Sequence, residues 1–155
     1  MNIELIKVNS NKKELLENLL QLYLHDISYY FPIEFDNNTC KYKYNLSSYF
    51  NNNYAYFITN NNEIAGFILI DDNSNNNYEI SEIFILNNYK NKNIGKEAIY
   101  KIFNKYKGNW TIKAVPNSNI AESFWDKVIY NYTNNNYKKL LTGKYNRPEY
   151  YFNNK

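Results

Sequence analysis

The sequence has almost none of the residues that build covalent or metal-bound frameworks. Its 155 residues include one cysteine, Cys40, and one histidine, His25. A single cysteine cannot form an intramolecular disulfide, so we expect the reducing environment of the cytoplasm and no catalytic thiol. No metal site is expected either.

Long apolar runs and a strong excess of one charge are also missing. No run approaches the roughly 18 apolar residues of a membrane span, and no basic segment followed by an apolar one opens the chain. The net charge is only +3. The basic residues alternate with Asn and Glu, and no base-stacking motif is present, so a nucleic-acid-binding module is disfavoured. We expect a soluble protein without a membrane or nucleic-acid partner.

What the chain has in excess is asparagine, about a fifth of all residues. The asparagines form short clusters between well-patterned segments. Asparagine tolerates left-handed backbone angles, so these clusters predict turns rather than a low-complexity tract. The clusters are Asn51–Asn53, Asn60–Asn62, Asn75–Asn77 and Asn134–Asn136. A length of 155 residues predicts one domain, residues 1–155.

The apolar periodicity predicts the order of the elements. Strands are expected at Ile3–Val8, Tyr54–Thr59, Ile64–Asp71, Tyr78–Leu86, Trp110–Val115, Tyr137–Thr142 and Glu149–Asn153. Helices are expected around Leu15–Tyr23, Ile94–Tyr106 and Asn119–Ile129, with a short one around Tyr42–Phe50. This order predicts an α/β (α+β) domain whose mixed, mostly antiparallel central sheet has helices on both faces.

Two local signals set the expected helix ends. Gly108 follows the second long helix and is expected just past its end. Asn119 and Glu122 have the spacing of a capping box at the start of the third.

The segment from Lys90 to Lys96 joins a predicted strand to a predicted helix. The first backbone N–H groups of a helix lack intrahelical partners, so such a loop favours an anion, and a pyrophosphate would fit there. The alternative is a solvated, lysine-rich turn in which Asn93 caps the helix.

In its context this loop resembles motif A of the GNAT N-acetyltransferases, Q/R-x-x-G-x-G/A after a strand. Lys90 stands where Arg or Gln is usual and Asn93 where the first Gly is usual, while Gly95 keeps the family residue. Asparagine can still adopt the positive φ that glycine supplies. The segment from Asn117 to Lys127 resembles the motif B helix, N-x-x-A-x-x-F-Y-x-K. Residues 20–26, 80–86 and 124–129 resemble a bacterial GNAT branch.

The resemblance implies a GNAT-like acyl-CoA N-acyltransferase fold and acetyl-CoA as cosubstrate. The strand carrying Phe84 and Ile85 would pair its backbone with the pantetheine arm, unless both simply pack in the core. The residues implied in cofactor binding are Phe84, Ile85, Lys90, Lys92, Asn93, Ile94, Gly95, Lys96, Asn117 and Asn119. Asn119 is equally explained as the helix cap.

Acyl transfer to an amine requires a base, and two residues are candidates. Glu82 lies mid-strand among apolar residues, where burial raises a carboxyl pKa, and related enzymes place a carboxylate there. The alternative is a structural carboxylate bonded across strands. His25 is the second candidate, against the alternative of a histidine that ends the first helix. Trp125 stands where the family often has an acidic Tyr, and an indole N–H is too weak an acid.

The resemblance thus predicts an N-acetyltransferase that moves an acetyl group from acetyl-CoA to a primary amine by direct attack in a ternary complex. The alternative is a catalytically silent acyl-CoA-binding sensor with the same fold. The acceptor is a small-molecule amine or a protein amine. The aromatic, partly acidic segment Tyr29–Tyr56 is expected to shape its pocket and hints at a cationic amine. A homodimer is left open.

Overall fold

The computed structural model describes all residues from 1 to 155 and is built on one seven-stranded sheet. In chain order the elements are β1 (Ile3–Lys7), η1 (Ser10–Lys12), α1 (Lys13–Ile27), β2 (Phe35–Asp36), β3 (Lys41–Tyr42), η2 (Ser47–Phe50), β4 (Tyr54–Asn60), β5 (Glu63–Asp72), β6 (Asn77–Ile85), η3 (Asn87–Tyr89), α2 (Ile94–Lys105), β7 (Asn109–Lys113), α3 (Asn119–Thr133), β8 (Lys138–Thr142) and β9 (Arg147–Asn153). None of the helices is long and apolar enough to cross a membrane.

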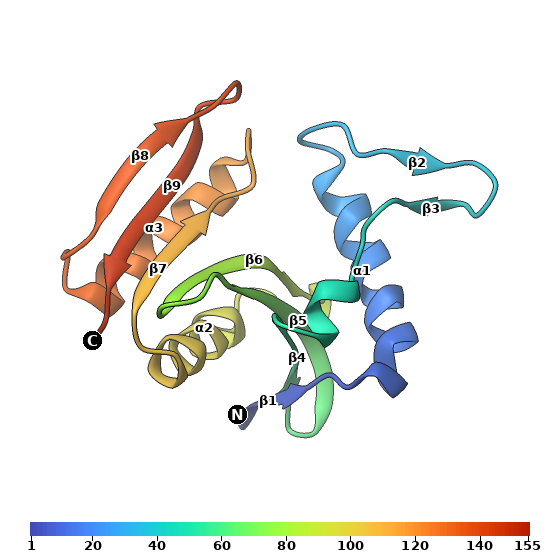
Figure 1. Cartoon of the computed structure of the whole chain (residues 1–155), viewed down its shortest axis with the longest axis horizontal. Helices are drawn as coiled ribbons and strands as arrows, with labels where there is room; N and C mark the ends of the chain where they lie inside the picture. Colours follow the sequence, from blue (N-terminus) through green and yellow to red (C-terminus); the bar gives the residue numbers. More distant parts are fainter.

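The strands run in the order β1-β4-β5-β6-β7-β9-β8 (Figure 1). All neighbours are antiparallel except β6 and β7, which are parallel. The prediction of a mixed, mostly antiparallel sheet is therefore confirmed. Because β6 and β7 run the same way, the chain must cross over between them, and α2 makes that crossover.

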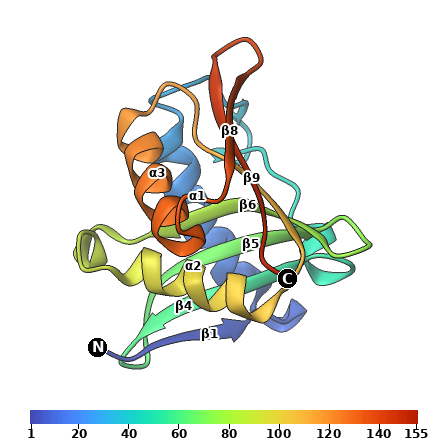
Figure 2. The same ribbon diagram turned by 90° about the vertical axis from the view of Figure 1, so that its left-hand side faces the viewer.

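Helices cover both faces of the sheet, as predicted. Side chains alternate between the faces of a strand, so β4 and β5 contribute to two separate cores. Phe57, Phe67 and Leu69 pack with α1 on one face, whereas Ile58, Ile68 and Ile70 pack with α2 and α3 on the other. Figure 2 shows α2 in front of the sheet and α1 behind it.

All four asparagine clusters contain turn residues, as predicted. Positive φ angles occur at Asn61, Asn62, Asn75, Asn76, Asn134 and Asn135. The cluster Asn51–Asn53 has no positive φ and instead follows η2. Asparagine thus supplies the left-handed turns that glycine supplies in most chains.

The segment between α1 and β4 was predicted only in part. The short helix expected around Tyr42–Phe50 is a 3-10 turn over Ser47–Phe50, and Tyr42 lies in the two-stranded ribbon β2–β3. The side chain of Gln21 bonds both backbone groups of Tyr42, accepting from its N–H at 2.8 Å and donating to its carbonyl at 2.9 Å. This tertiary contact holds the ribbon against α1, and no local sequence pattern predicts it.

The capping box predicted at the start of α3 is wrong by one residue. Ser118 is the N-cap, and its Oγ accepts a hydrogen bond from the Ala121 N–H at 3.1 Å. Asn119 is the first helical residue and is exposed. Glu122 therefore lies one position too late for the box, and its carboxylate pairs with Lys139 of β8 at 2.7 Å. The side chain of Glu122 therefore forms a long-range ion pair with β8 and not the local capping bond that the motif predicted.

Gly108 does not end α2 in the predicted way. The helix ends at Lys105, and the next residue, Tyr106, has an extended φ of −113°. A Cβ at Gly108 would lie 2.0 Å from the Asn76 carbonyl oxygen, which accepts a bond from the Asn109 N–H. Glycine is needed here for a close approach of two backbone segments.

Replacing Gly108 by Ala should therefore lower the free energy of unfolding by about 1–3 kcal/mol, because the backbone must shift to admit the methyl group. Urea denaturation measures the change. The matched control is Gly95→Ala, whose Cβ would meet its nearest neighbours at an ordinary 3.5 Å inside α2 and should not destabilise. Equal stability of the two variants would show that the approach at Asn76 is relaxed without cost.

Candidate active site

The candidate site begins where β6 and β7 separate. The two strands pair from Asn77 with Asn109 up to Ile80 with Ile112. Beyond that point β6 continues to Ile85, paired with β5 only. Figure 1 shows the two strands diverging here. An extended molecule can pair with the backbone groups of such an unpaired strand edge.

A β-bulge lies at the same point. Leu69 of β5 lies opposite Glu82, whereas Ile70 lies opposite Ile80, so Ser81 is the extra residue on β6. Plain alternation would put Ile80 and Glu82 on one face. The bulge instead leaves Ile80 in the core under α2 and α3 and turns Glu82 toward α1.

Two tyrosine side chains contact the carboxylate of Glu82. Its carboxylate accepts hydrogen bonds from the hydroxyls of Tyr23 on α1 and of Tyr44, the latter at 3.3 Å. Burial raises the pKa of Glu82 to about 7, although both hydrogen bonds and the charge of Arg147 favour the ionised form. A carboxyl group with this pKa exchanges protons near neutral pH. The Oγ of Ser81, next to it, is buried and has no hydrogen-bond partner.

The loop from Leu86 to Asn93 leads from the free edge of β6 to α2. Asn91 and Asn93 have φ angles of 59° and 61°, the left-handed conformation that the sequence required of Asn93. The Asn93 side chain makes no capping bond, so the alternative of an asparagine-capped turn is wrong. The N–H groups at the start of α2 are therefore open to an anion.

Lys90 and Lys92 of the loop are exposed, Lys96 at the start of α2 is partly buried, and all three make only weak contacts. Lys90 lies 3.9 Å from Asp26 of α1, and Lys92 donates to the Asn88 carbonyl at 2.8 Å. Lys96 pairs with Glu97 at 3.6 Å. Such surface pairs contribute little, so these ammonium groups can exchange their partners for a bound anion at low cost.

Gly95 faces the interior and not the loop. A Cβ built there would meet Ile85 of β6 and Phe124 of α3, both at 3.5 Å. Ile94 is buried beside it. A side chain larger than a methyl group at this position would therefore push against Ile85 and Phe124. Phe84 packs on the α1 side, in contact with Tyr23 and Phe67.

The structure places His25 apart from Glu82. His25 is exposed in the last turn of α1, and its Nδ1 lies 3.1 Å from the hydroxyl of Tyr42 on β3. Tyr23, which reaches Glu82, is two residues earlier and therefore points to another side of the helix.

Asn117 joins the two segments that flank the opening between β6 and β7. It has a φ of 63°, and its side-chain nitrogen donates to the Tyr30 carbonyl at 3.0 Å. The bond connects the chain that follows α1 with the chain that precedes α3. Asn119 is exposed just beyond it.

Three residues of this region were not singled out by sequence reasoning. Tyr23 and Tyr44 are two of 18 tyrosines, and nothing local distinguishes them. Arg147 is the only arginine in the sequence, and this was the one signal that could have marked it as a candidate site residue.

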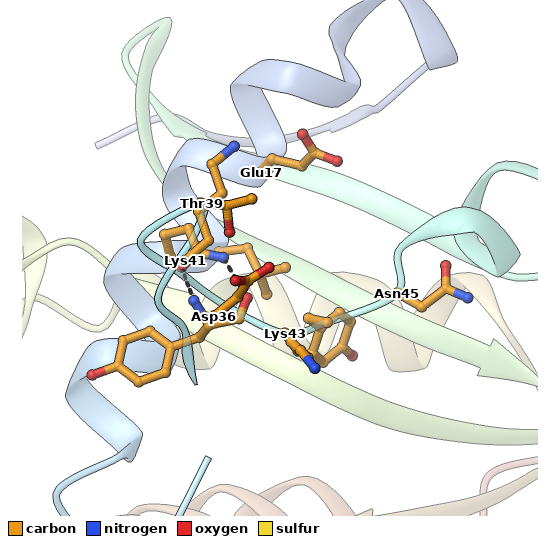
Figure 3. A pocket seen from close by; sticks show the side chains of 10 residues that line it. Glu17, Asp36, Thr39, Lys41, Lys43 and Asn45 are labelled. Atoms are coloured by element: carbon orange, nitrogen blue, oxygen red, sulfur yellow. Dashed lines mark hydrogen bonds between the residues drawn. The ribbon is translucent and has the colours of Figure 1, made fainter. Parts of the chain in front are cut away.

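A cavity of about 390 Å³ lies between α1 and the β2–β3 ribbon, beside the candidate site. Figure 3 shows Glu17 reaching it from α1 and Asp36, Thr39 and Lys41 from the ribbon. Tyr44 also lines this cavity and connects it to Glu82 through its hydroxyl. Its charged lining is balanced, since Glu17 and Asp36 face Lys41 and Lys43.

Solved structures with the same architecture come from several organisms. A domain from Methanocaldococcus jannaschii is 21% identical, with a TM-score of 0.68 and 99% of each chain covered. A Bacillus subtilis acetyltransferase in complex with CoA is 17% identical, with a TM-score of 0.59, covering 99% of this chain and 98% of the other. A Bacillus anthracis protein whose structure holds acetyl coenzyme A is 16% identical, with a TM-score of 0.59 and all of both chains covered.

No curated protein matches the sequence. The profile of the acetyltransferase (GNAT) family does match, over residues 16–128. This stretch contains most of α1, the bulged strand with Glu82, the loop into α2 and most of α3. The fold, the free edge of β6 and the loop geometry agree with that match. The chain belongs to the GNAT acetyltransferase family.

Proposed function

We propose that this protein binds acetyl-CoA along the free edge of β6 and transfers its acetyl group to a primary amine, with Glu82 as the base. The observation that carries the proposal is a carboxyl group whose pKa burial raises to about 7, at the point where β6 loses its second strand neighbour. The cosubstrate supplies the acetyl group as a reactive thioester.

The residues available to hold acetyl-CoA form a continuous path. The backbone of Phe84 and Ile85 offers pairing groups for the pantetheine arm, and the amides from Asn93 to Lys96 offer donors for the pyrophosphate. Lys90 and Lys92 add positive charge beside them. The left-handed backbone at Asn93 and the absence of a side-chain cap fit this group.

When the neutral form of the amine reacts, amide formation requires one proton to leave the nitrogen. Glu82 accepts it directly or through water, and the phenols of Tyr23 and Tyr44 orient the carboxylate. As the acceptor nitrogen bonds to the acyl carbon, the carbon–sulfur bond breaks and the thiolate leaves with the bonding electron pair. Trp125 is buried on the core side of α3, and its indole N–H is too weak an acid to protonate the thiolate. Because the thiol of CoA is fairly acidic, its thiolate can leave without a dedicated acid.

Titration with acetyl-CoA by calorimetry tests the cofactor site. Wild-type protein should bind with a dissociation constant on the order of micromolar. Gly95→Trp should weaken binding at least about tenfold, because the indole must displace Ile85, Phe124 or the start of α2. Gly95→Ala and Lys101→Trp, on the exposed side of the same helix, should bind like the wild type.

A second readout does not depend on the folding of a variant. On the ¹⁵N-labelled wild type, acetyl-CoA should shift the amide resonances of Asn91–Lys96 and of Phe84 and Ile85 more than any others. No binding, or shifts confined to another surface, would remove the basis for the acetyltransferase proposal.

A further inference from the structure

Arg147 is held at the edge of the opening between β6 and β7. It begins β9 and is half-buried. Its Nε donates to the Ala114 carbonyl at 2.7 Å, and its Nη2 donates to the Lys113 carbonyl at 3.4 Å. These bonds to the end of β7 fix the plane of the guanidinium group.

The guanidinium forms no salt bridge within the protein. No carboxylate oxygen lies within 4.0 Å of it. By contrast, Lys113 at the end of β7 is paired with Glu79 at 3.2 Å. The carboxylate of Glu149 is instead held by the hydroxyls of Thr142 and Tyr151. A guanidinium has five N–H donors, so most of those of Arg147 remain free, in the fork that matches a carboxylate.

The strand topology brings Arg147 to the same end of the diverging strands as Glu82. Ile80 pairs with Ile112, and beyond this last pair β6 continues to Glu82 and the chain of β7 continues to Ala114. Arg147 is bonded to that Ala114 carbonyl. Side chains alternate along β9, so Arg147, three residues before Tyr150, lies on the opposite face of the sheet from Tyr150. Tyr150 packs under α3, whereas Glu82 meets Tyr23 of α1. Arg147 therefore lies on the same face as Glu82. The positive charge of Arg147 favours the ionised form of Glu82.

We propose that Arg147 binds the carboxylate of the acceptor, so that the substrate is a small molecule carrying both a primary amine and a carboxylate, such as a free amino acid. The inference rests on the proposed function. The amine lies over Glu82, which takes its proton, and the carboxylate lies against the free donors of Arg147. The acceptor leaves as the N-acetylated amino acid. Such an acceptor differs from the purely cationic amine that the acidic N-terminal segment had suggested.

The test compares matched acceptors, each L-amino acid against its carboxamide, with wild-type protein, Arg147→Gln and Arg147→Lys. Arg147→Gln should raise KM for the amino acids about 10- to 100-fold, because one charge-assisted, forked pair is lost. KM for the carboxamides should change less than about threefold, by the same reasoning, since they carry no charge to pair. Arg147→Lys should fall between, since lysine keeps the charge without the fork.

Lys144→Gln, an exposed charge in the same β8–β9 hairpin, is the matched control and should leave both series unchanged. Retained turnover of carboxamides shows that Arg147→Gln is folded. The inference is wrong if Arg147→Gln affects both series equally, or if the wild type does not prefer the carboxylates.

A binding measurement separates this inference from the proposed function. Amino acids are titrated into protein saturated with CoA, and the same loss of affinity in Arg147→Gln is expected. Carboxylate-dependent binding without acetyl transfer would support the Arg147 site and contradict the proposed acetyltransferase activity. Transfer to amines without any carboxylate preference would do the reverse.

Discussion

Glu82→Gln is expected to lower kcat by about 10²- to 10⁴-fold, the usual contribution of a general base. Glutamine is isosteric and can still accept the hydrogen bonds of Tyr23 and Tyr44, but it cannot take up a proton. The affinity for acetyl-CoA should stay within about twofold, because only a noncontacting side chain is changed. Steady-state kinetics and calorimetry measure the two quantities.

The pH profile gives the same prediction a second signature. Below its pKa of about 7, Glu82 is protonated and cannot act as a base. The kcat of the wild type should therefore rise with pH through an inflection near 7 and level off above it, and Glu82→Gln should lack this inflection. Tyr44→Phe removes a donor that favours the ionised carboxylate, so the inflection should move to higher pH, by roughly 0.5–1 unit.

Glu79→Gln is the matched control, since Glu79 lies on the same strand and is paired with Lys113. Its kcat and its pH profile should follow those of the wild type. If Glu82→Gln retained full activity with an unchanged inflection, Glu82 would be a structural carboxylate and the base would have to be sought elsewhere.

Trp110→Ala should be the most destabilising single substitution considered, with a loss of about 3–5 kcal/mol in the free energy of unfolding. Trp110 on β7 is 1% exposed and lies 4.9 Å from the Phe103 ring and 5.2 Å from the Tyr78 ring, measured between centroids. Its indole N–H also donates to the Tyr106 carbonyl at 3.0 Å. Truncation leaves a cavity between α2 and the sheet.

Urea denaturation followed by tyrosine and tryptophan fluorescence measures this loss. Tyr130→Ala is the control, because that ring is 51% exposed on α3 and its removal should change stability by less than about 0.5 kcal/mol. A loss at Trp110 no larger than that at Tyr130 would mean that the core repacks around the missing indole.

Local patterns determined the element order, the mixed sheet and the loop from Lys90 to Lys96. Apolar residues recur with a period of two in the strands and near 3.6 in the helices, and these periods depend on the segment alone. Asparagine in place of glycine still predicts a left-handed turn, as Asn93 shows with a φ of 61°. Glu82 could be chosen as the base because a mid-strand carboxylate stands out among apolar neighbours.

Only the tertiary structure decided how these parts meet. Alternation alone would have put Glu82 on the face of Ile80, and the bulge at Ser81 turned it toward α1. The bonds that define the site join residues far apart in the chain: Tyr23 to Glu82 spans 59 residues and Arg147 to Ala114 spans 33. Such partners are set by strand register and packing, and neither leaves a periodic trace within one segment. For the same reason Gly108 and Asn119 were misassigned, since their roles depend on Asn76 and on the exact start of α3.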